Sequence, residues 1–390
     1  MIAMRHAGKR AAAIAADALM GLTAPLFVTK GKTVAIPARP RVLLIRCDHL
    51  GDAVMATAVV GSIKRALRAS RLDVVAGPWA APLFEQNPHV DAVIPVAAPW
   101  WLAARGAPLG DRVRGWLSLP RAVARIRSGQ YDVGVDLRGD LRQIFLFLAL
   151  GRCRERVSSD RTGGARLLTR CARYVASGHE VERGAAIAAL LGVKGPPVLE
   201  PPELPELDAA ASDAIAAVAG ANGYITLSTQ GTKRNRTWPA THAASLVERA
   251  AAELGLGTVY VGGPEDGAAA EETARLARVP MAQLAGKLPL LQSLKVIEGA
   301  RAAVAVDSGP MHLAALVDTP VVALFGPSDP ARYRPWASRY EIVCARAPCG
   351  CVDPDCEFTA SGPGACMMEL QPGVVFNALQ RLVGACVPVR

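Results

Sequence analysis

The sequence predicts an α/β protein made of two Rossmann-like domains, each with a parallel β-sheet covered by helices. Three observations support this prediction. Strand-like apolar runs alternate with helix-like segments over 41–195, the same alternation begins again after 208, and a proline-rich stretch separates the two halves. A chain of 390 residues that is 51% hydrophobic is long and apolar enough for two cores.

The first half begins with the apolar run 41–47, which has the composition of a buried strand. A turn containing Gly51 and a helix-like segment over 53–69 follow it. Further strand-like runs lie at 72–76, 92–96 and 131–136. Because strands alternate with helical segments, we expect a parallel sheet with helices on both faces.

The stretch 195–205 contains five prolines in eleven residues, which makes it too stiff and too poor in N–H donors for a helix or an inner strand. Beyond it, strands are predicted at 224–228, 257–262, 302–306 and 320–325. The predicted parts are an N-terminal extension (1–40), a first domain (41–195), a linker (196–207), a second domain (208–371) and a C-terminal helix within 372–390 that could pack back on the first domain. Two such domains would share a ligand cleft, lined by the loops at the carboxyl ends of their strands.

The N-terminal extension has a basic start and an apolar run over 11–28, which Asp17 and Pro25 interrupt. These interruptions argue against a secretory signal and against a membrane-spanning helix. Two alternatives remain for an amphipathic helix here. It lies on an anionic membrane surface, or it packs on its own domain.

The net charge of +10 favours an anionic partner, which is a phosphorylated ligand, a membrane surface or nucleic acid. Lys and Arg are spread along the chain and only 5% of residues are aromatic, so we expect no nucleic-acid partner. Three tryptophans of the first half follow no pattern that identifies a ligand: Trp100, Trp101 and Trp116.

The first motif that carries chemistry is the turn at 46–52, which follows the first predicted strand. Gly51 permits a sharp turn, and the carboxylate of Asp52 then lies at a helix start on the carboxyl edge of the sheet. A carboxylate there can act as a general base. The alternative is that Asp48 or Asp52 merely caps the helix.

The second motif follows the strand at 302–306. Asp307, Ser308 and Gly309 stand where backbone N–H groups and the helix dipole would point at a diphosphate. Pro310 continues the turn, and His312 lies in the first helical turn, where its ring can add a donor. The alternative is an ordinary turn and cap sequence with a packed histidine.

Two further loops follow strands of the second half. The loop at 228–239 carries hydroxyls and three cations, which suit a nucleotide diphosphate, and the loop at 261–266 offers a carboxylate to ribose hydroxyls. A solvated basic loop and an acidic helix start are the alternatives, but all three loops come from strand ends of one sheet, which favours a ligand site. The candidate residues of these two loops are Thr229, Lys233, Arg236, Gly263 and Glu265.

Three strings together resemble the ADP-heptose:lipopolysaccharide heptosyltransferase family, glycosyltransferase family 9. They are the Arg-x-Asp-x-Leu-Gly-Asp turn at 46–52, the Val-Asp-Ser-Gly-Pro-Met-His-Leu-Ala-Ala string at 306–315, and Thr-Pro-Val-Val-Ala-Leu-Phe-Gly-Pro-Ser-Asp-Pro at 319–330. The resemblance spans about 41–382, so the N-terminal extension lies outside it.

The resemblance implies a GT-B fold, a metal-independent inverting transfer of heptose, and Asp52 as the general base. It also implies a set of donor contacts, in which Ser308 replaces the more common Thr and Arg236 replaces the Lys of some members. The implied donor-binding residues are Thr229, Arg236, Glu265, Leu288, Asp307, Ser308, Gly309 and His312. We expect ADP-heptose or a similar nucleotide sugar as donor, a lipopolysaccharide-type acceptor, and a cytoplasmic protein that binds peripherally at the inner face of the inner membrane.

Five of the nine cysteines fall within 344–366, which suggests a local metal or thiol site in a reducing compartment. The best tetrahedral set for structural Zn or Fe is Cys349, Cys351, Cys356 and Cys366. Some family members with protein acceptors bind iron through such cysteines; free or pairwise oxidised thiols are the alternative. We expect no cofactor to be required for catalysis. Alternative functions are transfer of another nucleotide sugar, transfer to a protein acceptor, and a catalytically silent nucleotide-sugar-binding scaffold.

Overall fold

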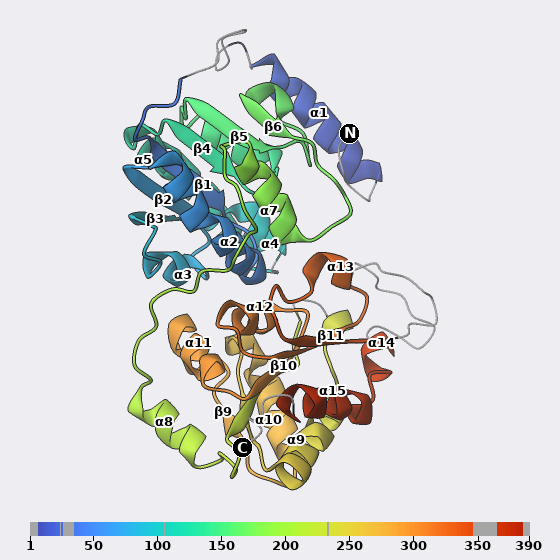
Figure 1. The fold of residues 1–390 in the computed structure, drawn as a ribbon. Helices are drawn as coiled ribbons and strands as arrows, with labels where there is room; N and C mark the ends of the chain where they lie inside the picture. The colour runs from blue at the N-terminus through green and yellow to red at the C-terminus, as the bar shows by residue number, and fades with distance from the viewer. Residues whose placement is uncertain are drawn as a thin grey trace. The chain divides into compact units, whose positions relative to one another are not determined.

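The computed structural model describes residues 7–23, 25, 35–104, 106–231, 234–345 and 365–384. The chain forms two compact units, Met1–Glu203 and Leu204–Arg390, drawn in Figure 1 from blue to green and from green to red. The division falls inside the proline-rich segment in which the linker was predicted. Each unit contains one six-stranded parallel sheet with helices, which confirms the predicted α/β fold of two Rossmann-like units.

The first unit has the strand order β3-β2-β1-β4-β5-β6, and all five pairings are parallel. Its strands are β1 (Arg41–Arg46), β2 (Arg71–Ala76), β3 (Ala92–Pro95), β4 (Val133–Asp136), β5 (Glu155–Ser159) and β6 (Arg170–Ala172). Five of the six residues of β1 are buried, as expected for an inner strand with both faces covered.

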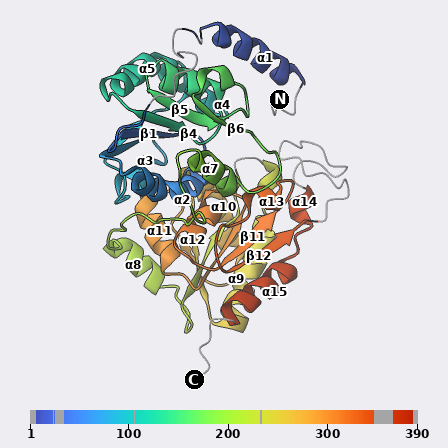
Figure 2. The same ribbon diagram turned by 45° about the horizontal axis from the view of Figure 1, so that its top comes forward.

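Helices cover both faces of this sheet, as Figure 2 shows for the first unit. On one face α2 packs against α7. On the other, α5 and the π-helix η2 share a core with β1, built around Leu43, Ile45, Ile126 and Phe147. The helical segments are α1 (Ala7–Leu22), α2 (Leu50–Leu67), α3 (Ala81–Glu85), α4 (Pro99–Ala104), α5 (Leu109–Ser128), α6 (Leu141–Gln143), η2 (Ile144–Ala149), η3 (Ala165–Leu167) and α7 (Glu180–Ala189).

Helix α1 packs on the first unit, which is one of the two alternatives left open by the sequence. Asp17 accepts a 2.6 Å hydrogen bond from the Gly164 amide, and Ala16 and Met20 pack on the core that α5 shares. The exposed side chains of α1 that the structure describes are all apolar, and they are Ala11, Ile14, Ala15, Ala18, Leu19 and Leu22. Among the described residues, no helix is both long and apolar enough to cross a bilayer.

The second unit repeats the topology of the first, with the order β12-β11-β10-β7-β8-β9 and parallel pairing throughout. Its strands are β7 (Tyr224–Ser228), β8 (Gly257–Tyr260), β9 (Ala282–Gln283), β10 (Ala302–Val306), β11 (Val321–Phe325) and β12 (Tyr340–Cys344). In each unit the strand order reverses beside the first strand, between β1 and β4 and between β7 and β10. Ligands of doubly wound sheets bind at such switch points, outside the carboxyl ends of the strands.

The predicted C-terminal helix is present as α15, and it packs on the core of the second unit. Its buried residues Val375, Phe376 and Leu379 belong to the second core, where α15 contacts α9, β10, β11 and β12. The helical segments of this unit are α8 (Ala209–Ala216), η4 (Arg234–Arg236), α9 (Ala240–Leu254), η5 (Pro264–Asp266), α10 (Gly267–Leu276), α11 (Leu290–Glu298), α12 (Gly309–Leu316), α13 (Pro330–Tyr333), α14 (Ala365–Met368) and α15 (Pro372–Gly384).

Candidate active site

Asp52 lies in the first turn of α2, at the switch point of the first sheet. The N-cap of α2 is His49, so neither Asp48 nor Asp52 takes the capping position. The Asp52 carboxylate instead forms a 2.9 Å ion pair with Arg46, and the same guanidinium donates to the Asp52 carbonyl at 3.1 Å. Arg46 ends β1 and also donates to the Leu137 carbonyl at 3.0 Å, which ties the two switch-point loops together.

Asp48 is fully buried between two arginines. Its carboxylate lies 3.1 Å from Nε of Arg46 and forms a second, short ion pair with Nη1 of Arg138. The same Nη1 lies 3.6 Å from Oδ2 of Asp52. These residues form a four-charge cluster, consisting of Arg46, Asp48, Asp52 and Arg138.

The cluster gives its two carboxyl groups opposite pKa shifts. Burial alone would raise the pKa of Asp52, but Arg46 and Arg138 outweigh burial and hold the pKa well below its ordinary range. The pKa of the more deeply enclosed Asp48 is raised, because burial there exceeds the effect of the same arginines. Asp52 is therefore a carboxylate that stays ionised over the whole neutral range.

Aromatic rings surround the four-charge cluster. The Arg138 guanidinium lies over the ring of Trp101, 4.2 Å from its centroid, and the His49 ring meets Trp101 edge-on at 5.4 Å. The Trp79 indole donates a 2.7 Å hydrogen bond to the Asp48 carbonyl. Trp101, which matched no pattern in the sequence, thus belongs to the wall of the candidate site.

Asp136 orders the loop that carries Arg138. Its Oδ2 accepts hydrogen bonds from the Gly139 amide (2.8 Å), the Asp140 amide (3.1 Å) and the Ser158 hydroxyl (2.8 Å). Burial nevertheless raises the pKa of Asp136 to about 6. The buried side chain of Asp136 therefore holds the turn after β4. This turn carries Arg138 to the end of β1, where it contacts Asp48.

A basic pocket of about 130 Å³ adjoins the cluster at the ends of β4, β5 and β6. Its charged lining side chains are Arg138, Arg161, Arg173, Arg183, Glu180 and Glu182, and we call it the arginine pocket. Glu180 is buried in a 2.6 Å ion pair with Arg183. Because the lining holds four arginines and two glutamates, its net charge is positive. This charge suits a small anionic group of a ligand whose reacting hydroxyl lies near Asp52.

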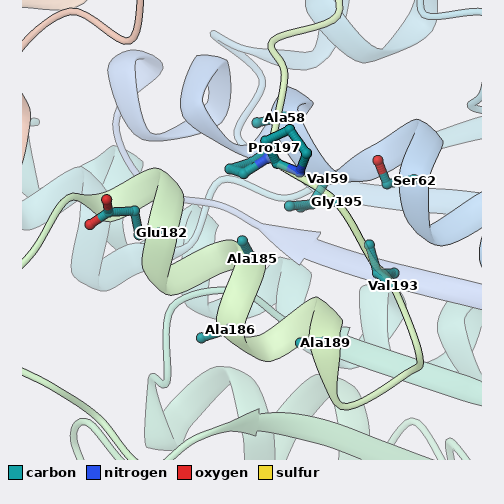
Figure 3. A pocket seen from close by; sticks show the side chains of 11 residues that line it. Ala58, Val59, Ser62, Glu182, Ala185, Ala186, Ala189, Val193, Gly195 and Pro197 are labelled. Atoms are coloured by element: carbon teal, nitrogen blue, oxygen red, sulfur yellow. The ribbon is translucent and has the colours of Figure 1, made fainter.

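A second hollow, of about 290 Å³, lies between α2, α7 and the segment 193–197 (Figure 3). Its lining side chains are apolar except for Ser62 and Glu182, and Glu182 already accepts a 2.8 Å hydrogen bond from the His179 amide at the start of α7. Such a surface offers little that could orient a sugar, so the arginine pocket is the better candidate for a polar ligand.

In the second unit, Thr229 follows β7 with its side chain turned inward. Its hydroxyl is buried within 2.5 Å of the Tyr260 hydroxyl, and its carbonyl accepts a 2.9 Å bond from the Trp238 amide. Gly231 and Arg236 of this loop lie so close together that a Cβ on residue 231 would be 2.4 Å from the Cβ of Arg236. Glycine, which has no Cβ, avoids this clash. Thr229 therefore anchors the loop that presents Arg236.

Arg236 and Asp307 meet at the second switch point, since Ser228 at the end of β7 pairs with Ala305 of β10. Nη1 of Arg236 lies 3.3 Å from Oδ2 of Asp307, which is buried. Ser308 is the N-cap of α12, but its hydroxyl donates to the Val306 carbonyl at 3.2 Å and caps no amide.

The start of α12 follows at once. Gly309 and Pro310 are its first two residues, and His312 is buried one turn in. The first-turn amides of a helix have no intrahelical partner, so they and Arg236 can converge on an anion.

The remaining predicted donor contacts lie on neighbouring loops of the second unit. The Gly263 amide donates to Asp266 at 2.7 Å, Glu265 is exposed on η5, and Leu288 is half-buried ahead of α11. Gly286 has φ +70°, and a Cβ on it would lie 2.6 Å from the Cα of Pro264, so the loops after β8 and β9 are in contact. Lys233 lies outside the described residues.

The predicted cysteine site is mostly outside the described part of the chain, which excludes Cys349, Cys351 and Cys356. Cys366 is buried and Cys344 is exposed. Among the residues that the structure describes, no three His, Cys, Asp or Glu side chains gather as a metal site would require. The metal hypothesis stays a prediction.

Comparison with known proteins identifies the family. The sequence profile of glycosyltransferase family 9 (heptosyltransferase) matches residues 120–359, more than half of the chain. The chain belongs to glycosyltransferase family 9. Lipopolysaccharide heptosyltransferase 1 of Pseudomonas aeruginosa is 28% identical over 306 residues, which cover 74% of this chain and 79% of that protein. The family resemblance of the three motifs is thus confirmed.

Solved structures confirm the GT-B fold. A glycosyltransferase family 9 protein from Veillonella parvula has a TM-score of 0.73 at 19% identity, with 91% of this chain and all of that chain covered. The Escherichia coli heptosyltransferase WaaC with ADP has a TM-score of 0.66 at 19% identity and covers 88% of this chain and 99% of its own. The sequence profile therefore shows the family 9 membership, and the two solved structures show the fold.

Proposed function

We propose that this family 9 protein transfers a heptose from ADP-heptose to a sugar acceptor of the lipopolysaccharide inner core, with inversion at the anomeric carbon. One observation carries the proposal. This family 9 chain has an ionised carboxylate, that of Asp52, at the switch point of the first sheet. It also has an arginine, Arg236, beside the start of α12 at the switch point of the second sheet. These are the two groups that sugar transfer needs.

In this proposal the second unit holds the donor. Arg236 and the first-turn amides of α12 bind the diphosphate, and His312 adds a donor near the sugar. Glu265 binds ribose hydroxyls, while Leu288 contacts the adenine. A related solved structure, WaaC, was obtained with ADP, which supports an ADP-linked donor. No metal is required, because Arg236 and the helix start stabilise the charge of the leaving group.

The acceptor hydroxyl reacts beside Asp52. Its oxygen forms a bond to the anomeric carbon while the bond from that carbon to the diphosphate breaks, and ADP leaves with the electron pair. Asp52 accepts the hydroxyl proton. Because Arg46 and Arg138 stabilise the carboxylate, it takes the proton only as the oxygen becomes acidic during bond formation. Attack opposite the leaving group inverts the configuration.

The arginine pocket supports an anionic acceptor. It shares Arg138 with the four-charge cluster, so a carboxylate or phosphate bound there would lie on a molecule whose hydroxyl reaches Asp52. The proposed place of action is the cytoplasmic face of the inner membrane, where this acceptor is assembled.

The donor is tested by incubating the purified protein with a panel of nucleotide sugars and measuring thermal stabilisation, followed by transfer to a core acceptor. ADP-heptose should stabilise the protein most and be consumed. Preference for another nucleotide sugar, or transfer only to a protein, would replace the proposal with that alternative. Stabilisation without any transfer would indicate a silent scaffold.

The first test of the mechanism concerns Arg138. Arg138→Gln is expected to raise the pKa of Asp52, because it removes one of the two cations that lower it, and so to move the acid limb of the pH–rate profile to higher pH. Transfer rates measured across acidic pH values check this. Arg142→Gln is the control, since Arg142 pairs with Asp140, outside the cluster. An unmoved limb would show that Arg138 does not act on the base.

We also propose that the N-terminal segment helps to bind an anionic membrane surface. Deletion of residues 1–32 should leave transfer to a detergent-dispersed acceptor intact and reduce binding to anionic vesicles, because it removes the apolar outer face of α1 and its neighbouring cations. Sedimentation with vesicles measures the effect. Loss of folding on truncation would instead make α1 an essential part of the first core.

For the cysteine segment we propose a structural Zn or Fe site made of Cys349, Cys351, Cys356 and Cys366. Elemental analysis of the purified protein should find close to one metal ion per chain, and Cys356→Ser should lower that content. Metal-free protein with free or pairwise oxidised thiols would contradict the proposal. Transfer by the metal-free protein is expected to persist, since the proposed transfer reaction does not use the cysteine site.

A further inference from the structure

Helix α5 carries an apolar stripe on its solvent side. Leu109, Val113, Trp116 and Leu117 are exposed by 70%, 47%, 58% and 72%. Their spacing of four, seven and eight residues from the first puts them on one face of the helix. The opposite face, with Leu119 and Ile126, is buried in the core of the first unit. The stripe is therefore apolar surface that the fold of the unit does not need.

Cations flank this stripe. Helix α5 contains five arginines and one aspartate, Asp111, which pairs with Arg114. Arg112 and Arg121 are exposed and lie one helical turn from Trp116 and Leu117 respectively. An exposed helix face with leucines, a tryptophan and arginines at its borders has the composition of a helix that lies in a membrane interface.

The stripe also adjoins the candidate active site. The Trp116 ring meets Trp100 edge-on at 6.1 Å, and Trp100 carries the guanidinium of Arg142 at 4.8 Å. Trp100 precedes Trp101, which covers Arg138 of the four-charge cluster. A surface bound along α5 would thus lie one short helix, α4, away from the site where the acceptor reacts.

We propose that the stripe of α5 is a docking surface for an anionic lipid bilayer. The leucines and Trp116 insert among the outer acyl segments, and Arg112 and Arg121 bind lipid phosphates. A second copy of this chain fits the surface poorly, because a symmetric contact would bring the arginines of both helices together. Neither the donor nor the transfer reaction enters this inference.

Helix α1 strengthens the case, since it packs on the same core as α5 and presents its own apolar face outward. Figure 2 shows α1 and α5 in the same outer layer of the first unit. One weak membrane contact gives marginal binding, whereas two that act together give stable attachment. The α5 stripe is the second contact in addition to α1.

The test measures binding of the full chain to vesicles of phosphatidylcholine, with and without phosphatidylglycerol. Leu117→Asp and Leu109→Asp should each weaken partitioning onto vesicles about tenfold or more. Each substitution removes an inserted leucine and adds a negative charge, which anionic lipids repel. Val198→Asp is the matched control, an exposed apolar residue of the same unit that lies off the helix. All variants should retain the thermal unfolding midpoint and transfer to a detergent-dispersed acceptor, which separates this inference from the proposed function.

The charge component has its own variants. Arg112→Gln and Arg121→Gln should each reduce partitioning about fivefold, and only onto vesicles that contain phosphatidylglycerol. Arg301→Gln, an exposed arginine of the second unit, is the control. Trp116→Phe should remove a blue shift of tryptophan emission that vesicles induce. Vesicle binding unaffected by the leucine substitutions would overturn the proposal, as would a concentration-dependent dimer in ultracentrifugation that Leu117→Asp dissociates.

Discussion

Asp52→Asn is expected to abolish transfer, with a rate loss of roughly 10²–10⁴, while donor affinity stays within a few-fold. The substitution removes the carboxylate that would accept the acceptor proton but keeps the size of the side chain. It also removes one anionic partner of Arg46, whose guanidinium keeps Asp48 and two carbonyls as partners. The first turn of α2 should therefore persist.

Single-turnover transfer and ADP calorimetry on the same preparation measure the two quantities separately. Asp213→Asn, an exposed aspartate on α8, is the control for the chemical change alone. Turnover near that of the unmodified protein would remove Asp52 from the role of base. A parallel loss of ADP affinity would mean that Asp52 supports the donor site instead of the proton transfer.

Much of this arrangement could be predicted from local sequence. The strands are short apolar runs bounded by Gly, Pro and polar residues, and polar motifs follow the strands that border each switch point. The sequence therefore located Asp52, Arg236 and Asp307 at the carboxyl edges of their sheets, where the structure has them. It also identified the family, because the Asp-Ser-Gly-Pro-Met-His string is specific.

What the sequence missed depends on contacts between distant segments. Arg138 lies 90 residues from Asp48 in the sequence, and its local sequence does not distinguish it from other loop arginines. The pairing of β4 with β1 brings the two residues into contact. Trp101 gains its place from the same approach of the two loops. Thr229 was expected to face the donor, but its hydroxyl is taken by Tyr260 from the adjacent strand. Local patterns locate strand ends, but they do not determine which way each side chain turns.

Arg236→Ala is expected to weaken ADP binding by about 10–100-fold, because a charge-assisted hydrogen bond to phosphate contributes roughly 1.5–3 kcal/mol. Asp307→Ala should weaken it too, since Asp307 holds the Arg236 guanidinium at 3.3 Å beside the start of α12. His312→Ala should have a smaller effect of the same sign. Calorimetry with ADP measures all three.

Adenosine distinguishes a phosphate contact from a general disturbance of the second unit. Its affinity should be nearly unchanged in Arg236→Ala, because the lost guanidinium serves only the diphosphate. Arg275→Ala, which removes an exposed arginine paired with Glu272, is the control for the loss of one positive charge. If ADP binds Arg236→Ala and Asp307→Ala as tightly as the unmodified chain, the diphosphate does not bind at the second switch point. If adenosine affinity falls as far as ADP affinity, Arg236 acts by holding the loop after β7 and not by contacting phosphate.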